Sequence, residues 1–278
     1  MRVRPCYFYT PAPRLDSVPR SGPRAGAVQV LDLEDSVPSL AKAGARDRLA
    51  AADLSGTGLP GVILRINSIE TPDGLADLRM LLDQGGHAGG VPVEVVFLPK
   101  VATGRDVAIC RSLLSALPDP PQIAAVIETV DAVENAFDIA AASDGLCFGQ
   151  ADLMSEMYAP DESYLAHARA RICVAAARHG LPAIDTNSFE LWDAEVIRAE
   201  SEAAKRCGFT GKAAIHPRQV DVIIETFSAD PAELDGYLRT IKDYESEGFA
   251  VSRDRVLAPP FVAKARRMLA LFDRGGQQ

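Results

Sequence analysis

The sequence lacks the features that mark nucleic-acid-binding, membrane and secreted proteins. Its 29 Lys and Arg are outnumbered by 38 Asp and Glu, and the net charge of −9 argues against the basic surface that a phosphate backbone requires. No apolar run is long enough to span a bilayer, and no charged and then apolar leader opens the chain. The five cysteines are odd in number, far apart and mostly within apolar runs, which is typical of reduced thiols. We therefore expect a cytoplasmic protein with small-molecule partners, no nucleic acid and no membrane.

A glycine-rich phosphate-binding turn is also missing. No Gly-x-Gly-x-x-Gly pattern follows any predicted strand, which disfavours a dinucleotide-binding fold. The composition, 47% hydrophobic and 24% charged, is that of a globular protein, and α/β barrels often reach 278 residues as one unit. What the chain does have is a regular alternation of short apolar runs with amphipathic segments. This pattern predicts an α/β fold, a (β/α)8 TIM barrel over residues 1–230, followed by a C-terminal helical extension over residues 231–278.

Each predicted strand is a short apolar run that ends in polar residues. The eight strands are expected at Cys6–Thr10, Ala27–Leu31, Gly61–Ile66, Val93–Leu98, Ile123–Ile127, Gly145–Phe148, Leu181–Asp185 and Lys212–Ile215. Helices are predicted where apolar residues recur with helical spacing. The first helix is expected after Ser36, with Lys42, Arg46 and Arg48 on its more solvent-exposed face, and the second at Pro72–Leu82, with Thr71 as its cap. Further helices are expected at Arg105–Leu117, at Ser163–His179, at Phe189–Cys207 and, after His216 and Pro217, in a segment that ends at Phe227. The extension is expected to contain helices at Ala232–Tyr244 and Phe261–Phe272. A flexible loop is expected at Gly85–Gly90.

The central stretch, residues 124–154, reads as strand, helix and strand, with a carboxylate after each strand. Glu128 follows the first strand directly, and Asp152 follows the second after a short polar turn. Because the carboxyl ends of parallel strands converge, these two carboxylates are expected to lie together and share one Mg²⁺. The alternative is that each carboxylate only caps the start of a helix.

Polar and charged side chains gather at the predicted carboxyl ends of the strands. They are Glu34, Asp35, Arg65, Asn67, Lys100, Glu128, Asp152, Asp185 and His216. So many acids at one rim would repel one another unless a metal and an anionic ligand were bound there. Arg65 is the expected anchor for a substrate carboxylate or an enolate oxygen, because a guanidinium group binds such oxygens bidentately. For Lys100 and His216, a structural role and contact with a ligand are equally compatible with the pattern.

Several stretches resemble, in order, the motifs of the citrate lyase β-subunit-like family (HpcH/HpaI aldolase/citrate lyase). They are LDLEDSVPSLAKAGAR, VILRIN followed by TPDGLADL, FLPKV, IETVDAVENAFDIA, CFGQADL and GFTGKAAIHPRQV, and they cover residues 28–227. The family includes malyl-CoA and citramalyl-CoA lyases. The resemblance therefore implies a Mg²⁺-dependent carbon-carbon lyase, or its reverse condensation, that converts a malyl-, citramalyl- or citryl-like β-hydroxyacyl thioester into an acyl thioester and a 2-keto acid. The thioester carrier would be coenzyme A or an acyl carrier protein.

The resemblance also assigns roles to individual residues. The implied catalytic residues are Arg65, Glu34 and Asp35. The implied metal ligands are Glu128 and Asp152. The implied substrate-binding residues are Arg65, Lys100, Glu128, Ala151 and Asp152.

Two segments depart from the family pattern. In the coenzyme A lyases of this family, an Asp in a C-terminal segment reaches into a neighbouring subunit and serves as the base. The comparable position here is Ala258, and Asp254 lies four residues away. The N-terminal strand also differs, which leaves Arg4 and Arg14 as candidate contacts for the thioester carrier. The resemblance further implies a homo-oligomer, expected to be a trimer, in which the extension packs on a neighbouring subunit.

Three functions remain open from the sequence. The first is the lyase, with the proton handled by Glu34, Asp35 or water in place of the missing base. The second is an aldolase acting on a free hydroxy-keto acid, although the related pyruvate aldolases use a His near the second strand, where this chain has Glu34 and Asp35. The third is an acyl-thioester-binding subunit or a thioesterase that lacks the base. The sequence does not name the acyl group or choose between coenzyme A and a carrier protein.

Overall fold

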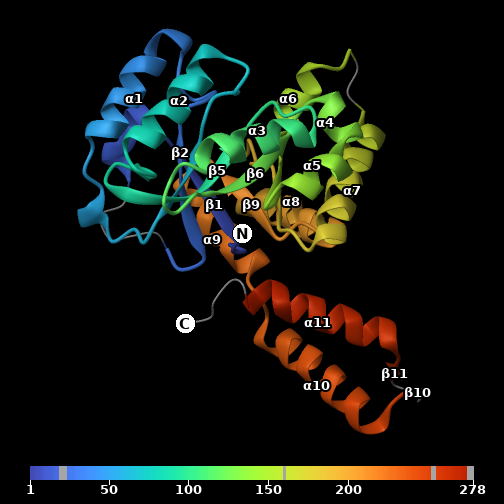
Figure 1. Cartoon of the computed structure of the whole chain (residues 1–278). Coiled ribbons are helices and arrows are strands. Elements are labelled where there is room, and N and C mark those ends of the chain that lie inside the picture. Colours follow the sequence, from blue (N-terminus) through green and yellow to red (C-terminus); the bar gives the residue numbers. More distant parts are fainter. Residues whose placement is uncertain (19–23, 159–160, 252–254, 274–278) are drawn as a thin grey trace. The chain divides into compact units, whose positions relative to one another are not determined.

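Eight parallel strands close into a barrel in this computed structural model, which describes residues 1–18, 24–158, 161–251 and 255–273 (Figure 1). The barrel strands are β1 (Cys6–Pro11), β2 (Ala27–Asp32), β3 (Val62–Arg65), β5 (Val91–Leu98), β6 (Gln122–Ile127), β7 (Gly145–Phe148), β8 (Ala183–Asp185) and β9 (Gly211–Ala214). They run in the order β3-β2-β1-β9-β8-β7-β6-β5, and the pairing of β3 with β5 closes the ring. The predicted (β/α)8 barrel is confirmed.

The barrel interior is filled by alternate residues of the strands, because successive side chains of a strand point to opposite faces. One buried cluster consists of strand residues alone: Tyr7, Val28, Val30, Ile63, Val95, Phe97, Ala124, Val126, Cys147 and Ile184. A second, larger cluster combines the other faces of the strands with the helices around them. The next inward-facing residue of a strand, just beyond this cluster at the carboxyl end, therefore lies at the mouth of the barrel.

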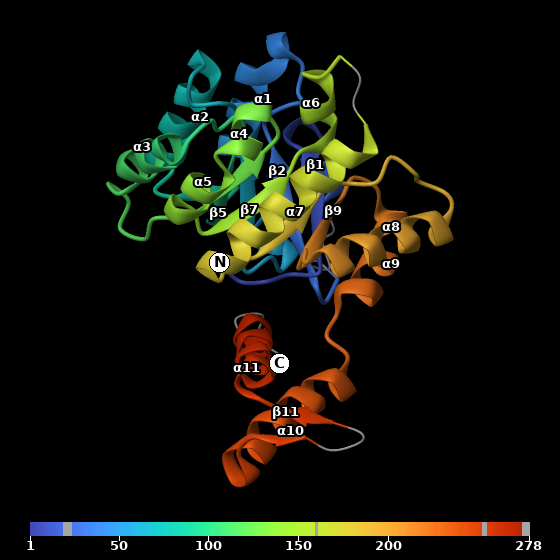
Figure 2. The same cartoon turned by 90° about the vertical axis from the view of Figure 1, so that its right-hand side faces the viewer.

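Helices surround the barrel, as Figures 1 and 2 show from two sides. They are α1 (Lys42–Ala51), α2 (Pro72–Asp83), α3 (Gly104–Leu114), α4 (Val130–Glu134), α5 (Ala136–Ala142), α6 (Gln150–Ser155), α7 (Glu162–His179), α8 (Ala194–Cys207) and α9 (Pro217–Phe227). Short 3-10 helices lie at Ala12–Ser17 (η1), Ser39–Ala41 (η2) and Ser55–Thr57 (η3). Capping residues fix the helix ends. The Thr71 hydroxyl accepts the Gly74 N–H at the start of α2, and Gly180, with a positive φ of 64°, ends α7.

Three local predictions were wrong. The helix expected from Phe189 begins only at Ala194, because Asp193 caps it and the preceding residues form a loop. The predicted flexible loop at Gly85–Gly90 contains β4 (His87–Ala88), which pairs antiparallel with β5. Arg46 does not lie on a wet face, since its guanidinium reaches the fully buried carboxylate of Asp77 at 3.1 Å.

The residues from Ser228 onward form a separate compact unit. Helices α10 (Pro231–Glu247) and α11 (Pro259–Asp273) pack against each other, and the strands β10 (Ala250–Val251) and β11 (Val256–Leu257) pair antiparallel between them. Both predicted helices are present. Ala258 is half-buried between β11 and α11, and Asp254 lies outside the described residues.

None of the five cysteines forms a disulfide, and four of them are buried. Among the described residues, none of the helices has the length and apolar character needed to cross a membrane.

A buried ion pair ties together the last two barrel strands. The Lys212 ammonium on β9 donates to Asp185 on β8 at 2.7 Å, and both side chains are only 1% exposed. Asp185 also accepts from Arg169 on α7 at 2.6 Å. Each partner of such a pair depends on the other, because an unpaired charge in the interior is strongly unfavourable.

We expect Lys212→Met to lower the free energy of unfolding by about 3 kcal/mol or more, since Asp185 then keeps a single cationic partner. Denaturant unfolding measures this change. Lys205→Met on the exposed end of α8 is the matched control and should cost much less. Equal losses in the two variants would show that the buried pair contributes no more than a surface lysine.

Candidate functional site

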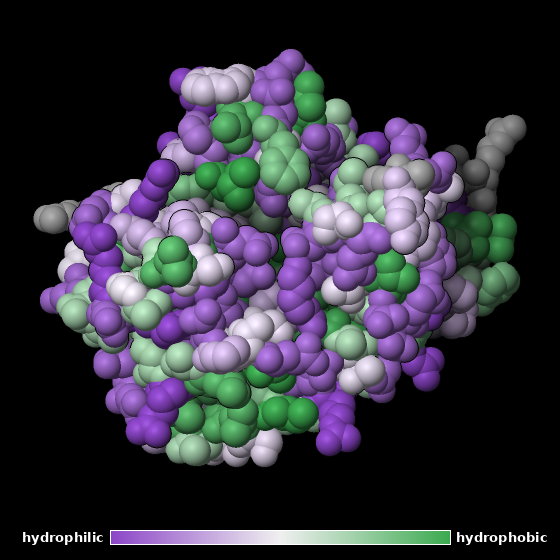
Figure 3. All heavy atoms as spheres, turned by 90° about the horizontal axis from the view of Figure 1, so that it is seen from above, coloured by the Kyte–Doolittle hydropathy of each residue, from purple (hydrophilic) through white to green (hydrophobic). Residues whose placement is uncertain are grey.

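A cavity of about 380 Å³ opens at the carboxyl ends of the barrel strands. Figure 3 shows this face of the molecule, where hydrophilic residues surround a central hollow. The charged and polar residues that line the cavity are Asp32, Asp35, Ser36, Arg65, Glu128, Gln150, Asp152, Thr186 and Asn187. Ala151 and the aromatic residues Tyr9, Phe148 and Phe189 line it as well. The side chains come from most of the barrel strands, so the ring closure itself brings them together.

Arg65 lies at the end of β3 among acidic side chains of the β2 end. Its Nε and Nη2 donate to the two carboxylate oxygens of Asp32, each at 2.7 Å, which is a bidentate pair. Its Nη1 lies 2.8 Å from Glu34 and 3.9 Å from Asp35. The guanidinium also lies over the Tyr9 ring, 5.2 Å from the ring centroid. Arg65 is thus held rigidly, with its remaining N–H donors at the wall of the cavity.

The two buried acids of this cluster differ in their proton affinity. Burial works to raise the pKa of Asp32, but the paired Arg65 and further hydrogen bonds outweigh it and lower that pKa. Burial raises the pKa of Glu34 to about 8, with the charges of Glu128 and Asp35 adding to the effect and Arg65 opposing it. One guanidinium group neutralises one of the two buried carboxylates, so the second carboxylate favours its protonated form near neutral pH.

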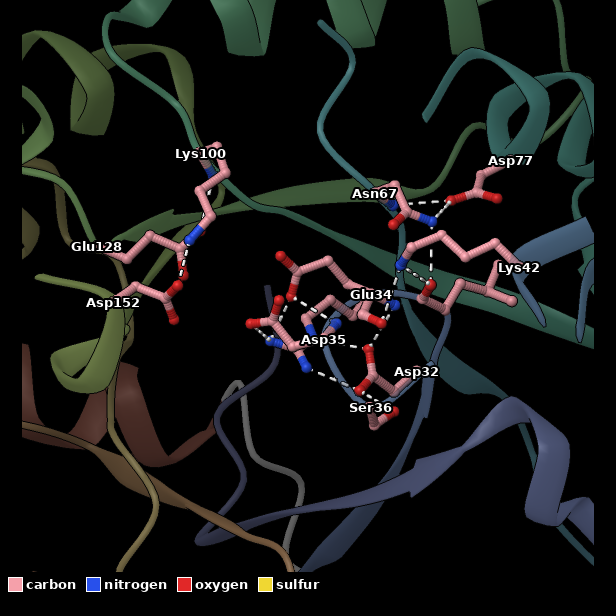
Figure 4. Close-up of polar contacts among 12 residues, drawn as sticks. Asp32, Glu34, Asp35, Ser36, Lys42, Asn67, Asp77, Lys100, Glu128 and Asp152 are labelled. Carbon is pink, nitrogen blue, oxygen red and sulfur yellow. Dashed lines mark hydrogen bonds and ion pairs between the residues drawn. The ribbon is translucent and has the colours of Figure 1, made fainter. Parts of the chain in front are cut away.

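A second polar group faces this cluster in Figure 4, where Lys100 points toward Glu128 and Asp152. The Lys100 ammonium donates to Asp152 and lies 3.5 Å from Glu128 Oε1. Glu128 is 1% exposed, and burial raises its pKa to about 7 against the attraction of Lys100. The structure contradicts the capping alternative for Glu128, because Thr129 caps α4. The carboxylate of Glu128 is therefore available to the cavity.

Two backbone features hold Glu128 in place. Lys100 has a φ of 55°, the only positive value among the described non-glycine residues, and its backbone N–H donates to Glu128 Oε1 at 2.8 Å. A non-glycine residue in this conformation is uncommon and costs about 1 kcal/mol or more, and such strain is often found at functional sites. Gly149 approaches Glu128 so closely that an added Cβ would lie 2.5 Å from the Glu128 Cβ. Position 149 therefore requires glycine.

The donor set of Glu128 and Asp152 fits a hard divalent cation. Two carboxylates at the edge of an open cavity are the protein ligands that Mg²⁺ uses when water and substrate oxygens complete its octahedron. Among the described residues, no group of three or more His, Cys, Asp or Glu is arranged to hold a metal. A metal bound by Glu128 and Asp152, which both line the cavity, would take its other ligands from water and substrate.

The other residues predicted at the rim have different positions. Asn67 donates to Leu33 O and to Asp77, and His216 lies beside the Trp192 ring, so neither lines the cavity. Asp185 is buried in its pair with Lys212. Arg14 is exposed in η1, and Arg4 precedes β1, at the opposite end of the strand from the cavity. Contact of Arg4 or Arg14 with a thioester carrier stays a prediction.

Asp32, Tyr9 and Gln150 also line the cavity, although they were not predicted as site residues. Asp32 and Tyr9 continue the alternating interior series of β2 and β1, so a strict count of alternate positions would have found them. Gln150 was recognised only as part of a turn. Its side chain contacts Arg169 of α7, whose Nη2 donates to Gln150 Oε1 at 2.9 Å, and no local pattern reveals that contact.

Comparison with known proteins gives consistent matches over most of the chain. The sequence model of the family described as HpcH/HpaI aldolase/citrate lyase matches residues 22–217. A protein of Cereibacter sphaeroides named (3S)-malyl-CoA thioesterase is 30% identical over 277 residues, which is 95% of this chain and 92% of that protein. An L-malyl-CoA/beta-methylmalyl-CoA lyase of the same species is 28% identical, covering 82% of this chain and 80% of the relative.

A solved structure is similar over the full length. The protein CitE of Mycobacterium tuberculosis, in complex with magnesium, acetoacetate and coenzyme A, has a TM-score of 0.72 and 26% identity, and the match covers 99% of each chain.

Glu34 should make the stability of the protein depend on pH. Because its folded pKa of about 8 lies above its ordinary value of 4.5, the stability it contributes is fully present below about pH 4.5 and is lost as pH rises through 8. We expect the melting temperature of the wild type to fall relative to Glu34→Gln between pH 5 and pH 9. Thermal melts of both proteins across this range measure the difference. A constant difference would assign an ordinary pKa to Glu34.

Lys100 should weaken the binding of a divalent cation, because its ammonium lies against both carboxylates. We expect Lys100→Gln to bind Mg²⁺ more tightly than the wild type by at least about 10-fold, because two unit charges about 4 Å apart interact by about 4 kcal/mol at an effective dielectric constant of about 20, and solvent screening lowers that value. Isothermal titration with Mg²⁺ measures the affinity. Lys42→Gln, on α1, is the control, since Lys42 donates to the carbonyl oxygens of Leu33 and Glu34 and is not paired with Glu128 or Asp152 among the described residues. Weaker binding in Lys100→Gln would assign the lysine to the metal site as a supporting residue.

Proposed function

Because the chain belongs to the HpcH/HpaI aldolase/citrate lyase family, we propose that it is a Mg²⁺-dependent lyase that cleaves a carbon-carbon bond in a β-hydroxyacyl thioester. The products would be an acyl thioester and a 2-keto acid. The observation that carries the proposal is that two groups face each other at the mouth of the barrel. One is Arg65, which lines the cavity and pairs with the buried Glu34, and the other is the carboxylate pair of Glu128 and Asp152.

The relatives support this substrate class. Proteins named citrate lyase subunit beta, malyl-CoA lyase and malyl-CoA thioesterase all match the chain, and the last two names give a malyl group joined to coenzyme A as the substrate. The similar CitE structure contains magnesium, a keto acid and coenzyme A. We therefore propose a malyl-, citramalyl- or citryl-like substrate on coenzyme A or an acyl carrier protein.

The proposed cleavage requires a group that takes up the hydroxyl proton. When that proton moves to Glu34, the C–O bond becomes a carbonyl, the adjacent C–C bond breaks, and its electron pair forms the enolate of the acyl thioester. A carboxylate with a pKa near 8 suits both directions of this transfer, because its two protonation states coexist near neutral pH. The enolate is then protonated at carbon to give the acyl thioester.

The new negative charge needs stabilisation as it forms. Arg65 would supply a fixed cation that remains charged throughout, and its bidentate contact with Asp32 fixes its orientation before the substrate arrives. Mg²⁺, held by Glu128 and Asp152, would polarise the oxygens of the hydroxy acid. Asp35 is exposed 3.9 Å from Arg65, where it would adjust the charge of the cluster. Ala151 lines the cavity and would form part of the wall around the acid, whereas Lys100 does not line it and would act through its ion pairs with Glu128 and Asp152.

Hydrolysis of the same thioester is the second candidate function. Two observations favour it: the 30% identical relatives named malyl-CoA thioesterase, and Ala258, which replaces the Asp expected of a lyase base. In hydrolysis, water attacks the thioester carbonyl, the C–S bond breaks, and a free hydroxy acid and a thiol are released. The aldolase and the non-catalytic binding subunit keep the same cavity but would show neither of these products from a thioester.

We also propose the assembly that the sequence suggested. Residues 1–230 would form the catalytic domain, and residues 231–278 would pack on a neighbouring subunit of a homotrimer. This arrangement would place the region of Ala258 near the cavity of another chain. Light scattering at micromolar concentrations tests the oligomeric state.

The decisive assay incubates the protein with malyl-, citramalyl- and citryl-CoA in the presence of Mg²⁺. The lyase releases a 2-keto acid and an acyl thioester, whereas the thioesterase releases free coenzyme A and a hydroxy acid, so the two activities give different products. We expect the lyase products, and we expect Asp152→Ala or a chelator to abolish turnover, because Asp152 supplies one of two protein ligands. Persistent activity of Asp152→Ala in chelator would overturn the metal-dependent mechanism.

A further inference from the structure

We propose that Gln150 is a substrate-binding residue whose amide N–H donates to an oxygen of the bound 2-keto or 2-hydroxy acid, and that Arg169 is the positioning residue that orients this amide. The inference rests on the proposed function, because it assigns a residue that binds the 2-keto or 2-hydroxy acid part of that substrate.

The orientation of the Gln150 amide follows from hydrogen-bond chemistry. Arg169 Nη2 donates to Gln150 Oε1 at 2.9 Å. A guanidinium group has five N–H donors and no acceptor, so the oxygen of the amide must face it and the NH₂ must face away. The usual ambiguity between the oxygen and nitrogen of a glutamine is therefore resolved by its partner.

Arg169 is itself held on several sides. Its Nη1 donates at 2.6 Å to Asp185, which the buried Lys212 fixes from the other direction. Its guanidinium lies over the Phe148 and Phe209 rings, 5.3 and 5.7 Å from their centroids. An arginine that is paired and stacked in this way loses little further freedom when it orients a neighbour. The network runs from the barrel strands through α7 to the first residue of α6, elements that can be followed in Figure 2.

The amide nitrogen of Gln150 has only a weak protein acceptor. Among the described residues, its contact is the thioether sulfur of Met154 at 3.6 Å. A thioether is a poor acceptor compared with oxygen, so the nitrogen keeps the capacity to donate a strong hydrogen bond. Gln150 is half-buried and lines the site cavity, so the acceptor can come from a bound molecule.

The position of Gln150 determines which part of the substrate it meets. It lies two residues before Asp152 in α6, and both residues line the site cavity. Gln150 also lines a second cavity of about 610 Å³, and the two cavities share Thr186, Asn187 and Phe189 as well. Gln150 thus lies where the site cavity continues into the second cavity, toward α7 and α8. A neutral N–H donor at this position favours a ligand that presents an oxygen acceptor.

Calorimetric titration of the full-length protein tests the inference without turnover. Pyruvate and glyoxylate, each with saturating Mg²⁺, report on the acid half, and coenzyme A reports on the carrier. We expect Gln150→Leu to weaken keto-acid binding by about 10- to 100-fold, the usual contribution of a hydrogen bond to a charged group, and to leave coenzyme A binding unchanged. Arg169→Lys keeps a cation beside Asp185 but loses the second guanidinium nitrogen, which donates to Gln150. It should therefore weaken keto-acid binding to a similar extent.

The double variant separates positioning from general damage. If Arg169 acts through Gln150, the double variant Gln150→Leu with Arg169→Lys should bind the keto acid no more weakly than Gln150→Leu alone. Arg178→Lys, exposed on the same helix, is the control and should bind normally. Additive losses, or an unchanged affinity in Gln150→Leu, would overturn the inference.

The failure of the proposed function has a different signature. A wild-type protein that binds neither keto acid nor coenzyme A in the presence of Mg²⁺ would overturn both proposals. A wild-type protein that binds the keto acid, while Gln150→Leu loses only coenzyme A affinity, would overturn the inference alone and assign Gln150 to the carrier.

Discussion

The charge balance inside the mouth of the barrel is the constraint on which the site depends. The alternating side chains of parallel strands leave only a few inward positions at the carboxyl ends, and this chain fills several of them with acids. Arg65 is the cation that makes the first group possible, since it neutralises Asp32 and leaves Glu34 as the acid with raised proton affinity. Lys100 performs the corresponding role for Glu128 and Asp152. Burial raises the pKa values of Glu34 and Glu128, and the cation beside each of them acts against that rise.

The arrangement divides the cavity into two sides with different chemistry. On one side, the fixed guanidinium and a protonatable carboxyl group suit the transfer of a proton and the stabilisation of an oxyanion. On the other side, the two carboxylates suit a hard cation that chelates an acid. A substrate that carries a carboxylate, a hydroxyl group and an acidic C–H bond would interact with both sides of the cavity at once. A simple acyl ester would interact with only one side.

Much of the fold and part of the site follow from the sequence alone. Strand ends such as Ile127 and Phe148 are visible because apolar runs stop abruptly at polar residues, and this placed Glu128 and Asp152 correctly at one cavity. The partners of those residues are not visible, because they depend on which face of a helix meets the barrel. Arg169 looks like any arginine on an amphipathic helix until the packing of α7 brings it to Gln150. The late start of α8 was missed because hydrophobic loop residues such as Trp192 imitate a helical pattern.

The left-handed backbone of Lys100 has a consequence for how this site can change over evolutionary time. The residue contributes two separable things: a backbone N–H aimed at Glu128, which depends on the conformation, and an ammonium group, which depends on the side chain. Glycine and asparagine adopt this conformation more readily than lysine, whereas valine and isoleucine adopt it poorly. Sequence drift to glycine or asparagine at position 100 would therefore preserve the shape of the loop while altering the electrostatics of the site. A descendant could acquire a new ligand preference there without first rebuilding its architecture.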